Sequence, residues 1–316
     1  MRTKKQARRF GARASVLVLG LVVAGAVLAP ASPASAAVPG LVRVSVTSVS
    51  NSADFHSATA TCPVGKVLTG TGYELNGVTG EGIVDDLRPN GGPATAPTAV
   101  TVGAYETEAF AGNWSVTAYA ICANPVPGLV RVSTTSVSDS ADFHSTTATC
   151  PVGKVLTGTG YELNGVTGEG VVDDFRPNGG VAAAPTSVTV GAYESDATAL
   201  NWSATAYAIC ANPLPGLVRA STVGTSNSLD FRSVVATCPI GRVMTGAGYE
   251  LNGVTGEGIV DDFRPNGGPA TAPTWPPRVR TRRTRSPGTG PTRRTRSARR
   301  RSNHSSGAAA AGRLHR

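Results

Sequence analysis

The chain has 316 residues, of which 38 are glycine and 22 are proline, and 5% are aromatic. It is too rich in glycine for an ordinary α/β enzyme and too rich in aliphatic residues for a wholly disordered protein. Of its 29 Lys and Arg residues, six lie in 1–37 and thirteen in 275–316, two segments without acidic residues. The segment 38–274 therefore holds ten basic against all 20 acidic residues, and we expect no nucleic-acid partner.

The N-terminal segment has the pattern of a secretory signal peptide. A basic stretch precedes a 14-residue apolar run, Ser15 to Leu28, which is too short to span a bilayer comfortably. Ala34 and Ala36 then fit the Ala-x-Ala cleavage rule. We expect a signal peptide over 1–36, a secreted, extracellular product, and no membrane contact after cleavage. An uncleaved N-terminal anchor is the alternative.

A long repeat is the strongest pattern in the rest of the chain. A Gly-Leu-Val-Arg sequence begins at Gly40, Gly128 and Gly216, so the repeat is 88 residues long, and the first two copies differ at 14 of 88 positions. A unit of this size can bury a small core of its own, and the linkers carry two prolines each, so we expect separate beads on a string. The predicted domains are β repeats over 38–127 and 128–215 and a truncated β repeat over 216–274.

Each repeat shows the alternation of β-strands. Short segments rich in Val, Thr, Tyr and Ile are separated by clusters of Gly, Pro and Asn that are typical of turns. No window has helical periodicity over more than two turns. The predicted fold class is all-β, with tandem small antiparallel β-sandwich or barrel domains of about six or seven strands each. The strands expected in the first repeat are 41–50, 59–62, 66–75, 82–87, 99–106 and 113–122.

Four of the five cysteines occur in pairs of equal spacing. Cys62 and Cys122 are 60 residues apart, and so are Cys150 and Cys210. In an exported protein this pattern predicts one disulfide in each of the first two repeats, worth about 4 kcal/mol on the chain-entropy model. Free thiols or metal ligands are the alternatives, although no Cys-x-x-Cys spacing of a zinc site occurs. Cys238 has no partner at this spacing.

The third repeat departs from the pattern after Thr274. Residues 275–316 are rich in Arg, Ser and Thr, and predict a disordered basic tail. Permitted codons for 278–282 also spell Gly-Ala-Tyr-Glu in the frame two bases later, and further motifs follow in the same frame. That frame places a cysteine over Ala298, 60 residues after Cys238. We therefore predict a frameshift product, a third repeat without its last two strands, and at most partial order over 216–316.

An acidic segment recurs in every repeat. Because adjacent Asp residues on a strand point to opposite faces, they do not form a catalytic pair of carboxylates. We interpret the segment as a solvated turn with an ion pair between an Asp and Arg88. An oxygen-rich Ca²⁺ site is the alternative, and Ca²⁺ is the one cofactor considered. The residues concerned are Asp85, Asp86 and Asn90 in the first repeat and Asp173, Asp174 and Asn178 in the second.

Tyrosine–glutamate pairs at strand ends, together with a tryptophan, could form a sugar-stacking platform. The alternative places the tryptophan in the core beside the disulfide. No catalytic residue is assigned, because His, Asp and Ser occur together only within the tetrapeptide Asp54 to Ser57. The ligand-binding candidates are Tyr73, Glu74, Tyr105, Glu106 and Trp114 in the first repeat and Tyr161, Glu162, Tyr193, Glu194 and Trp202 in the second.

The segments TATCPVGKVLTGTGYEL, SVTVGAYE and NWSVTAYAICA resemble a repeat of secreted actinobacterial proteins, with a CPxGK start and a WSxTAYAxCA end. The resemblance covers the first two repeats and the first two thirds of the third. It implies an exported, disulfide-closed β module and leaves the activity open.

These patterns predict a secreted, non-catalytic repeat protein that acts as an extracellular or cell-wall-associated binding or structural module. A cell-surface glycan or protein is the expected partner, and tandem copies of a weak site raise avidity. The alternative is an extracellular hydrolase, or its accessory carbohydrate-binding part, that uses Asp85 or Glu106.

Overall fold

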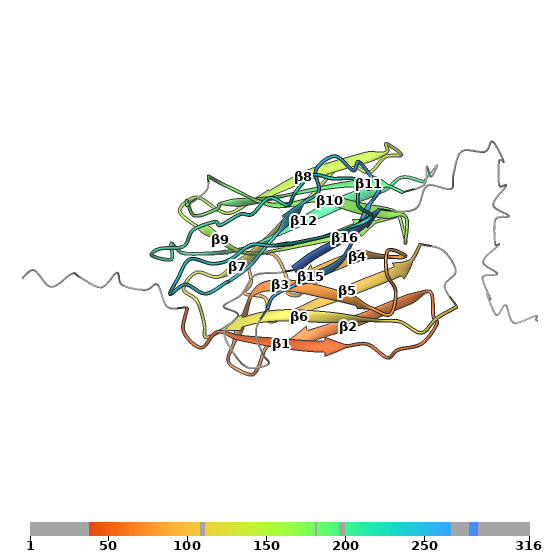
Figure 1. Cartoon of the computed structure of the whole chain (residues 1–316). Coiled ribbons are helices and arrows are strands. Elements are labelled where there is room, and N and C mark those ends of the chain that lie inside the picture. The colour runs from red at the N-terminus through yellow and green to blue at the C-terminus, as the bar shows by residue number, and fades with distance from the viewer. Residues whose placement is uncertain (1–37, 108–110, 181, 196–199, 267–277, 284–316) are drawn as a thin grey trace, which may run out of the picture. The chain divides into compact units, whose positions relative to one another are not determined.

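The computed structural model describes residues 38–107, 111–180, 182–195, 200–266 and 278–283. The regular elements of these residues are all β-strands, which confirms the predicted all-β class (Figure 1). The expected signal peptide over 1–36 and the tail beyond residue 283 lie outside the described residues. All three repeats belong to one compact unit, Ala36–Arg316.

The first two repeats have six strands each, in matching order. The first contains β1 (Val42–Thr47), β2 (Phe55–Thr61), β3 (Val67–Asn76), β4 (Gly82–Pro89), β5 (Ala99–Glu106) and β6 (Ser115–Ala123). The second contains β7 (Val130–Thr135), β8 (Phe143–Thr149), β9 (Val155–Asn164), β10 (Gly170–Asn178), β11 (Ser187–Glu194) and β12 (Ser203–Ala211). The third contains β13 (Phe231–Val235), β14 (Tyr249–Glu250), β15 (Gly258–Arg264) and β16 (Arg278–Arg283).

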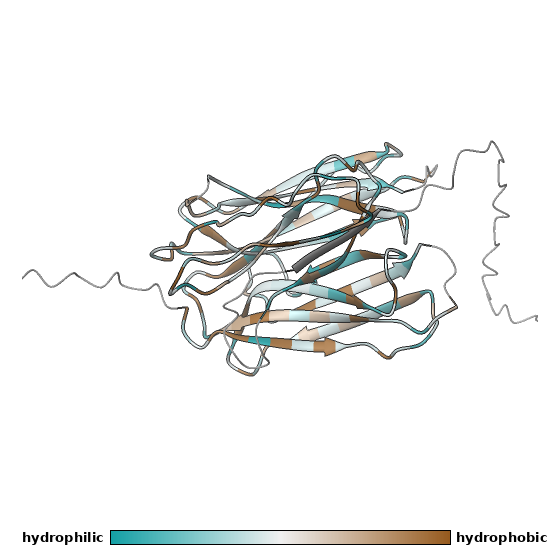
Figure 2. Ribbon diagram, viewed as in Figure 1, coloured by the Kyte–Doolittle hydropathy of each residue, from teal (hydrophilic) through white to brown (hydrophobic). Residues whose placement is uncertain are grey.

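Each complete repeat is a small sandwich of two three-stranded antiparallel layers. In the first repeat, β1, β6 and β3 form one layer, and β2, β5 and β4 form the other. Apolar and polar residues alternate along the strands (Figure 2), so that β2 buries every second residue while its other side chains face solvent. The predicted disulfides Cys62–Cys122 and Cys150–Cys210 are present, and each joins the two layers of its repeat.

Strand pairing continues from each repeat into the next, so the expectation of separate beads is wrong. β4 pairs with β9, β10 pairs with β14, and β15 returns to pair with β3 of the first repeat. The order of pairing is therefore cyclic. Each contact uses two residue pairs in the same register: Asp86↔Glu162 and Leu87↔Tyr161, Asp174↔Glu250 and Phe175↔Tyr249, and Asp262↔Glu74 and Phe263↔Tyr73.

A cluster of aromatic rings fills the place where the repeats meet. The ring centroids of Phe175 and Phe263 lie 5.6 Å apart, and each ring also contacts Tyr249, at 5.6 and 5.5 Å. Tyr73 and Tyr161 complete the cluster, at 5.9 Å from Phe263 and 5.1 Å from Phe175 respectively. Tyr73, Tyr161, Phe175 and Phe263 are almost fully buried, so the apolar contact between repeats is extensive.

Three glycines allow the backbones of the repeats to approach closely. A Cβ atom on Gly70, Gly158 or Gly246 would overlap a threonine carbonyl oxygen of another repeat. Next to these glycines, the Thr71 hydroxyl donates a hydrogen bond of 2.7 Å to the Thr159 carbonyl oxygen. The backbones of the three repeats therefore meet directly at these positions, which a side chain larger than hydrogen prevents.

The third repeat has fewer and shorter strands than the other two among the described residues. β16 pairs with β15 and β13, as β5 pairs with β4 and β2, so the prediction of a wholly disordered tail over 275–316 is wrong for 278–283. Among the described residues, nothing corresponds to β6 or β12. The two strands that would flank such a strand are also reduced. β14 has only two residues, and 218–223, the counterpart of β1, form no strand.

We predict that Gly158→Ala lowers the free energy of unfolding by about 3 kcal/mol, because the new methyl group must displace the backbone at Thr69. Gly180→Ala is the matched control, since a Cβ atom there meets nothing within 4 Å. Urea unfolding curves for both variants measure the difference. Equal stability of the two variants contradicts the close approach of the strands.

Candidate functional site

The two tryptophans lie in the core, and the stacking-platform hypothesis is wrong for them. Trp114 and Trp202 are fully buried, and each packs edge-on against a buried histidine at 4.3 Å between ring centroids. Their indole N–H groups donate to the carbonyl oxygens of Ala53 and Ala141, at 3.0 and 2.9 Å. Neither ring presents a face to a ligand.

Tyr73 and Tyr161 are equally inaccessible, because they belong to the aromatic cluster between the repeats. The Tyr73 hydroxyl donates to the Val260 carbonyl oxygen at 3.1 Å. Burial and the neighbouring tyrosines raise the pKa of both phenols well above the ordinary value, so these hydroxyls stay protonated. A cavity of about 10 Å³ lies beside them, enough for one water molecule and far too small for a sugar.

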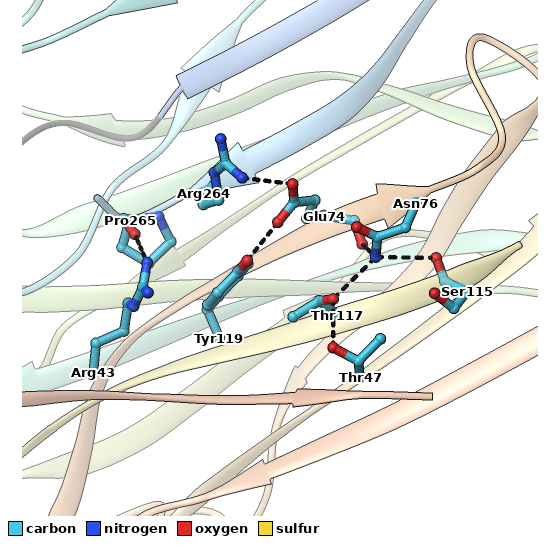
Figure 3. Close-up of polar contacts among 9 residues, drawn as sticks. All are labelled: Arg43, Thr47, Glu74, Asn76, Ser115, Thr117, Tyr119, Arg264 and Pro265. Carbon is cyan, nitrogen blue, oxygen red and sulfur yellow. Dashed lines mark hydrogen bonds and ion pairs between the residues drawn. The ribbon is translucent and has the colours of Figure 1, made fainter. Parts of the chain in front are cut away.

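Glu74 holds the third repeat to the first. Its Oε1 atom accepts a hydrogen bond from Arg264 of the third repeat at 2.5 Å, and its Oε2 atom accepts one from the Tyr119 hydroxyl at 2.5 Å (Figure 3). Arg43 lies over the Tyr119 ring, 5.0 Å from its centroid, and donates to the Pro265 carbonyl oxygen at 2.6 Å. The Glu74 carboxylate therefore binds Arg264 of the third repeat through one oxygen and Tyr119 of its own repeat through the other.

Glu162 makes the same contacts between the first and second repeats. Arg88 pairs with Glu162 at 3.1 Å, so the expected local ion pair between Arg88 and an Asp is wrong. Tyr207 donates to the other carboxylate oxygen, and the Arg131 guanidinium lies 4.8 Å from the centroid of the Tyr207 ring. Sequence patterns could not identify these partners, because the two glutamates and their surroundings are identical in each copy.

The three residues singled out in the acidic segment of the first repeat lie in three different environments. Asp85 is buried and accepts a hydrogen bond from the Gly168 backbone of the next repeat at 2.9 Å, whereas Asp86 lies across the strand pair from Glu162. Asn90 accepts hydrogen bonds from the backbones of Thr98 and Ala99. The interpretation of Asp85 as part of a solvated turn is therefore wrong.

The corresponding residues of the other repeats behave similarly. Asp173 accepts from the Gly256 backbone at 3.0 Å, and Asp261 accepts from Gly80 at 3.2 Å, so a buried aspartate anchors a turn of a neighbouring repeat three times. Asp174 faces Glu250 across the strand pair, and Asn178 donates to Ser187 and Thr189. In the part of the chain that the structure describes, no group of three or more His, Cys, Asp or Glu could hold a metal ion.

Burial makes these aspartates poor acids. Desolvation raises the pKa of Asp85 to about 8, an effect that the Gly168 N–H opposes and that nearby Asp86 and Glu169 reinforce. Desolvation likewise raises the pKa of Asp173 to about 6, with the Gly256 N–H acting against it. Asp85 is therefore mostly protonated at neutral pH in the folded protein.

We predict that stability falls as the pH rises from about 4 to about 8, because folded Asp85 retains a proton that the unfolded chain releases. One such proton contributes up to about 1.4 kcal/mol per pH unit to the free energy of unfolding. Asp85→Asn keeps an acceptor for Gly168 and removes this slope. Asp54→Asn, at an exposed position of the same repeat, is the control. Parallel slopes for the two variants in urea unfolding at several pH values contradict the assignment.

Tyr105 and Tyr193 are the tyrosine candidates that reach the surface. The Tyr105 ring lies 4.5 Å from Phe55, whose exposed fraction is 42%, and the Tyr193 ring lies 4.5 Å from Phe143, which is 41% exposed. Glu106 and Glu194 follow them at the strand ends. Their backbone N–H groups donate to the backbone carbonyl oxygens of Asp54 and Asp142. Sequence reasoning missed the phenylalanines, although alternation from the buried histidines already places them on the outer face.

Hydroxyl groups extend from each aromatic pair along the outer face of its sheet. In the first repeat, Thr59 and Thr101 are joined across the strands at 2.9 Å, and in the second Thr147 and Thr189 are joined at 2.8 Å. We call each set an aromatic–hydroxyl strip. The first strip comprises Phe55, Ser57, Thr59, Thr61, Thr101 and Tyr105, and the second comprises Phe143, Ser145, Thr147, Thr149, Thr189 and Tyr193.

Comparison with known proteins adds no functional assignment: no protein-family model matches the chain, and no curated protein matches it. Within the described residues, no helix is long and apolar enough to cross a membrane.

Proposed function

We propose that the chain is a secreted, non-catalytic module that binds extended glycans at the cell surface or in the cell wall through its two aromatic–hydroxyl strips. The duplicated, exposed Phe–Tyr pair carries this proposal. The two pairs have equal centroid separations of 4.5 Å and interplanar angles of 38° and 36°, so the same surface is presented twice.

The packing of Phe55 supports a stacking role. A Cβ atom on Gly103 would lie 3.2 Å from Phe55 Cε2, so the ring rests on the backbone of β5 and turns its other side to solvent. The sugar ring has an apolar C–H face bordered by hydroxyl groups, and it suits an aromatic surface that continues into a row of hydrogen-bonding groups. Exposed Ser57, Thr59 and Thr61 supply such a row.

The contacts of the acidic candidate residues support binding over catalysis. Asp85, one of the two residues that the hydrolase alternative names, is buried against the next repeat and accepts a hydrogen bond from the Gly168 N–H. Glu74 and Glu162 are engaged by arginine and tyrosine. The disulfides favour export, because they persist in oxidising compartments. Two strips on one compact unit allow a polymer to be held at two points.

We predict that Phe55→Ala or Phe143→Ala weakens binding to polysaccharide about tenfold, and that the double variant weakens it about a hundredfold, because each substitution removes one stacking surface. Glycan-array binding followed by titration calorimetry with the best oligosaccharide measures the effect.

Val64→Ala and Val152→Ala are the matched controls, because both valines are fully exposed apolar residues outside the strips. Unchanged binding by the Phe55→Ala/Phe143→Ala double variant contradicts the proposed site. Release of shortened sugars that stops in Asp85→Asn supports the hydrolase alternative instead.

A further inference from the structure

Among the described residues of the third repeat, the inward face of β13 is only partly covered. In the complete repeats, the inward side chains of β2 and β8 are buried, and β6 and β12 pack against these strands. The four corresponding positions of the third repeat are only half-buried: Arg232, Val234, Ala236 and Cys238. The face that β6 and β12 cover in the other copies is thus partly open here.

The strand beside this face is also shortened. β3 and β9 have ten residues each and pair along their length with β6 and β12. Their counterpart β14 is limited to Tyr249–Glu250, the two residues that pair with β10. Gly246, Ala247 and Gly248, whose counterparts in the first repeat are buried, are half-buried. Among the described residues, one strand position of the third repeat is open, and we call it the open strand position.

We propose that the open strand position is an acceptor for an added β-strand of the β6 and β12 type, whose cysteine forms a disulfide with Cys238. This inference goes beyond the proposed glycan binding and does not depend on it. The first two repeats show the occupant in place: a strand with small inward residues that ends in a cysteine bonded 60 residues back along the chain.

The register of the added strand follows from the second repeat. There, Ala206 lies opposite Tyr161 and Cys210 lies opposite Leu156. The same register in the third repeat places an alanine opposite Tyr249 and the cysteine opposite Met244. β6 and β12 fill the equivalent place with small, fully buried residues, Ala118 and Ala120 in the first repeat and Ala206 and Ala208 in the second.

The sequence favours one source for this strand, which is the shifted reading frame of residues 275–298. In this frame, permitted codons spell the final-strand motif and place its cysteine 60 residues after Cys238, the spacing of both disulfides. A peptide with the sequence of residues 201–211 stands in for this strand in the following experiment.

The test uses the full chain and the peptide NWSATAYAICA, whose cysteine is supplied as a mixed disulfide with glutathione. The Cys238 thiolate attacks the peptide sulfur, the peptide–glutathione bond breaks, and the departing glutathione thiolate takes up a proton. We expect a 1:1 adduct at Cys238, formed at least tenfold faster than with a scrambled peptide that keeps the cysteine in the same place. We also expect new protection from hydrogen exchange over 243–252.

Two controls separate strand binding from thiol chemistry. The variant Cys238→Ser must form no adduct, yet the peptide must still protect 243–252 in it. Equal adduct rates for the ordered and scrambled peptides, or no protection in either chain, overturn the proposal.

A second variant supplies the strand within the chain. Replacing residues 275–316 by the sequence of residues 187–213 substitutes the β11 sequence for β16 and adds a strand of the β12 type at the correct spacing. We expect Cys238 to resist alkylation in this variant unless a reductant is added, and the strand content to rise in circular dichroism. Persistence of a free Cys238 thiol in the exported variant overturns the proposal.

Discussion

The short antiparallel contact between the fourth strand of one repeat and the third strand of another determines where most polar residues of the chain lie. Each contact brings together one apolar pair, such as Leu87 and Tyr161, and one acidic pair, such as Asp86 and Glu162. The apolar pair enters the shared aromatic cluster. The acidic pair would repel, and the arginine two residues beyond the aspartate compensates by binding the glutamate. Three arginines and three glutamates are therefore occupied in holding the repeats together, in the pairs Arg88–Glu162, Arg176–Glu250 and Arg264–Glu74.

Sequence patterns were sufficient for the features that are local or that depend on spacing. The strand predicted at 59–62 overlaps β2, and the equal separation of cysteines identified both disulfides. The contacts between repeats could not be obtained in this way. Tyr73 and Tyr161 occupy identical sequence surroundings, so no pattern distinguishes a contact within one copy from a contact with the next. The same ambiguity assigned Arg88 to a nearby Asp, whereas its partner is 74 residues away.

The candidate site shows the same division between predictable and unpredictable parts. The alternation of NWSVTAYAIC left two environments open for Trp114, and burial places it in the core. Tyr105 was identified as a surface aromatic, but its partner Phe55 lies on a strand 50 residues earlier, and only the pairing of β2 with β5 brings them together. The proposed recognition surface is the outer face of two sheets, although Tyr105 and Tyr193 also lie beside Gly168 and Gly256 of the following repeats.

Cyclic pairing has a consequence for the evolution of the gene. Nearly identical tandem copies recombine readily, and an open array gains or loses units with little structural cost because each end resembles any other end. Here the last copy must return to the first, since β15 completes the sheet that begins with β1. A fourth copy would have no partner strand, and a chain of two would leave both terminal edges unpaired. A change in the number of copies therefore requires these contacts between repeats to be rearranged.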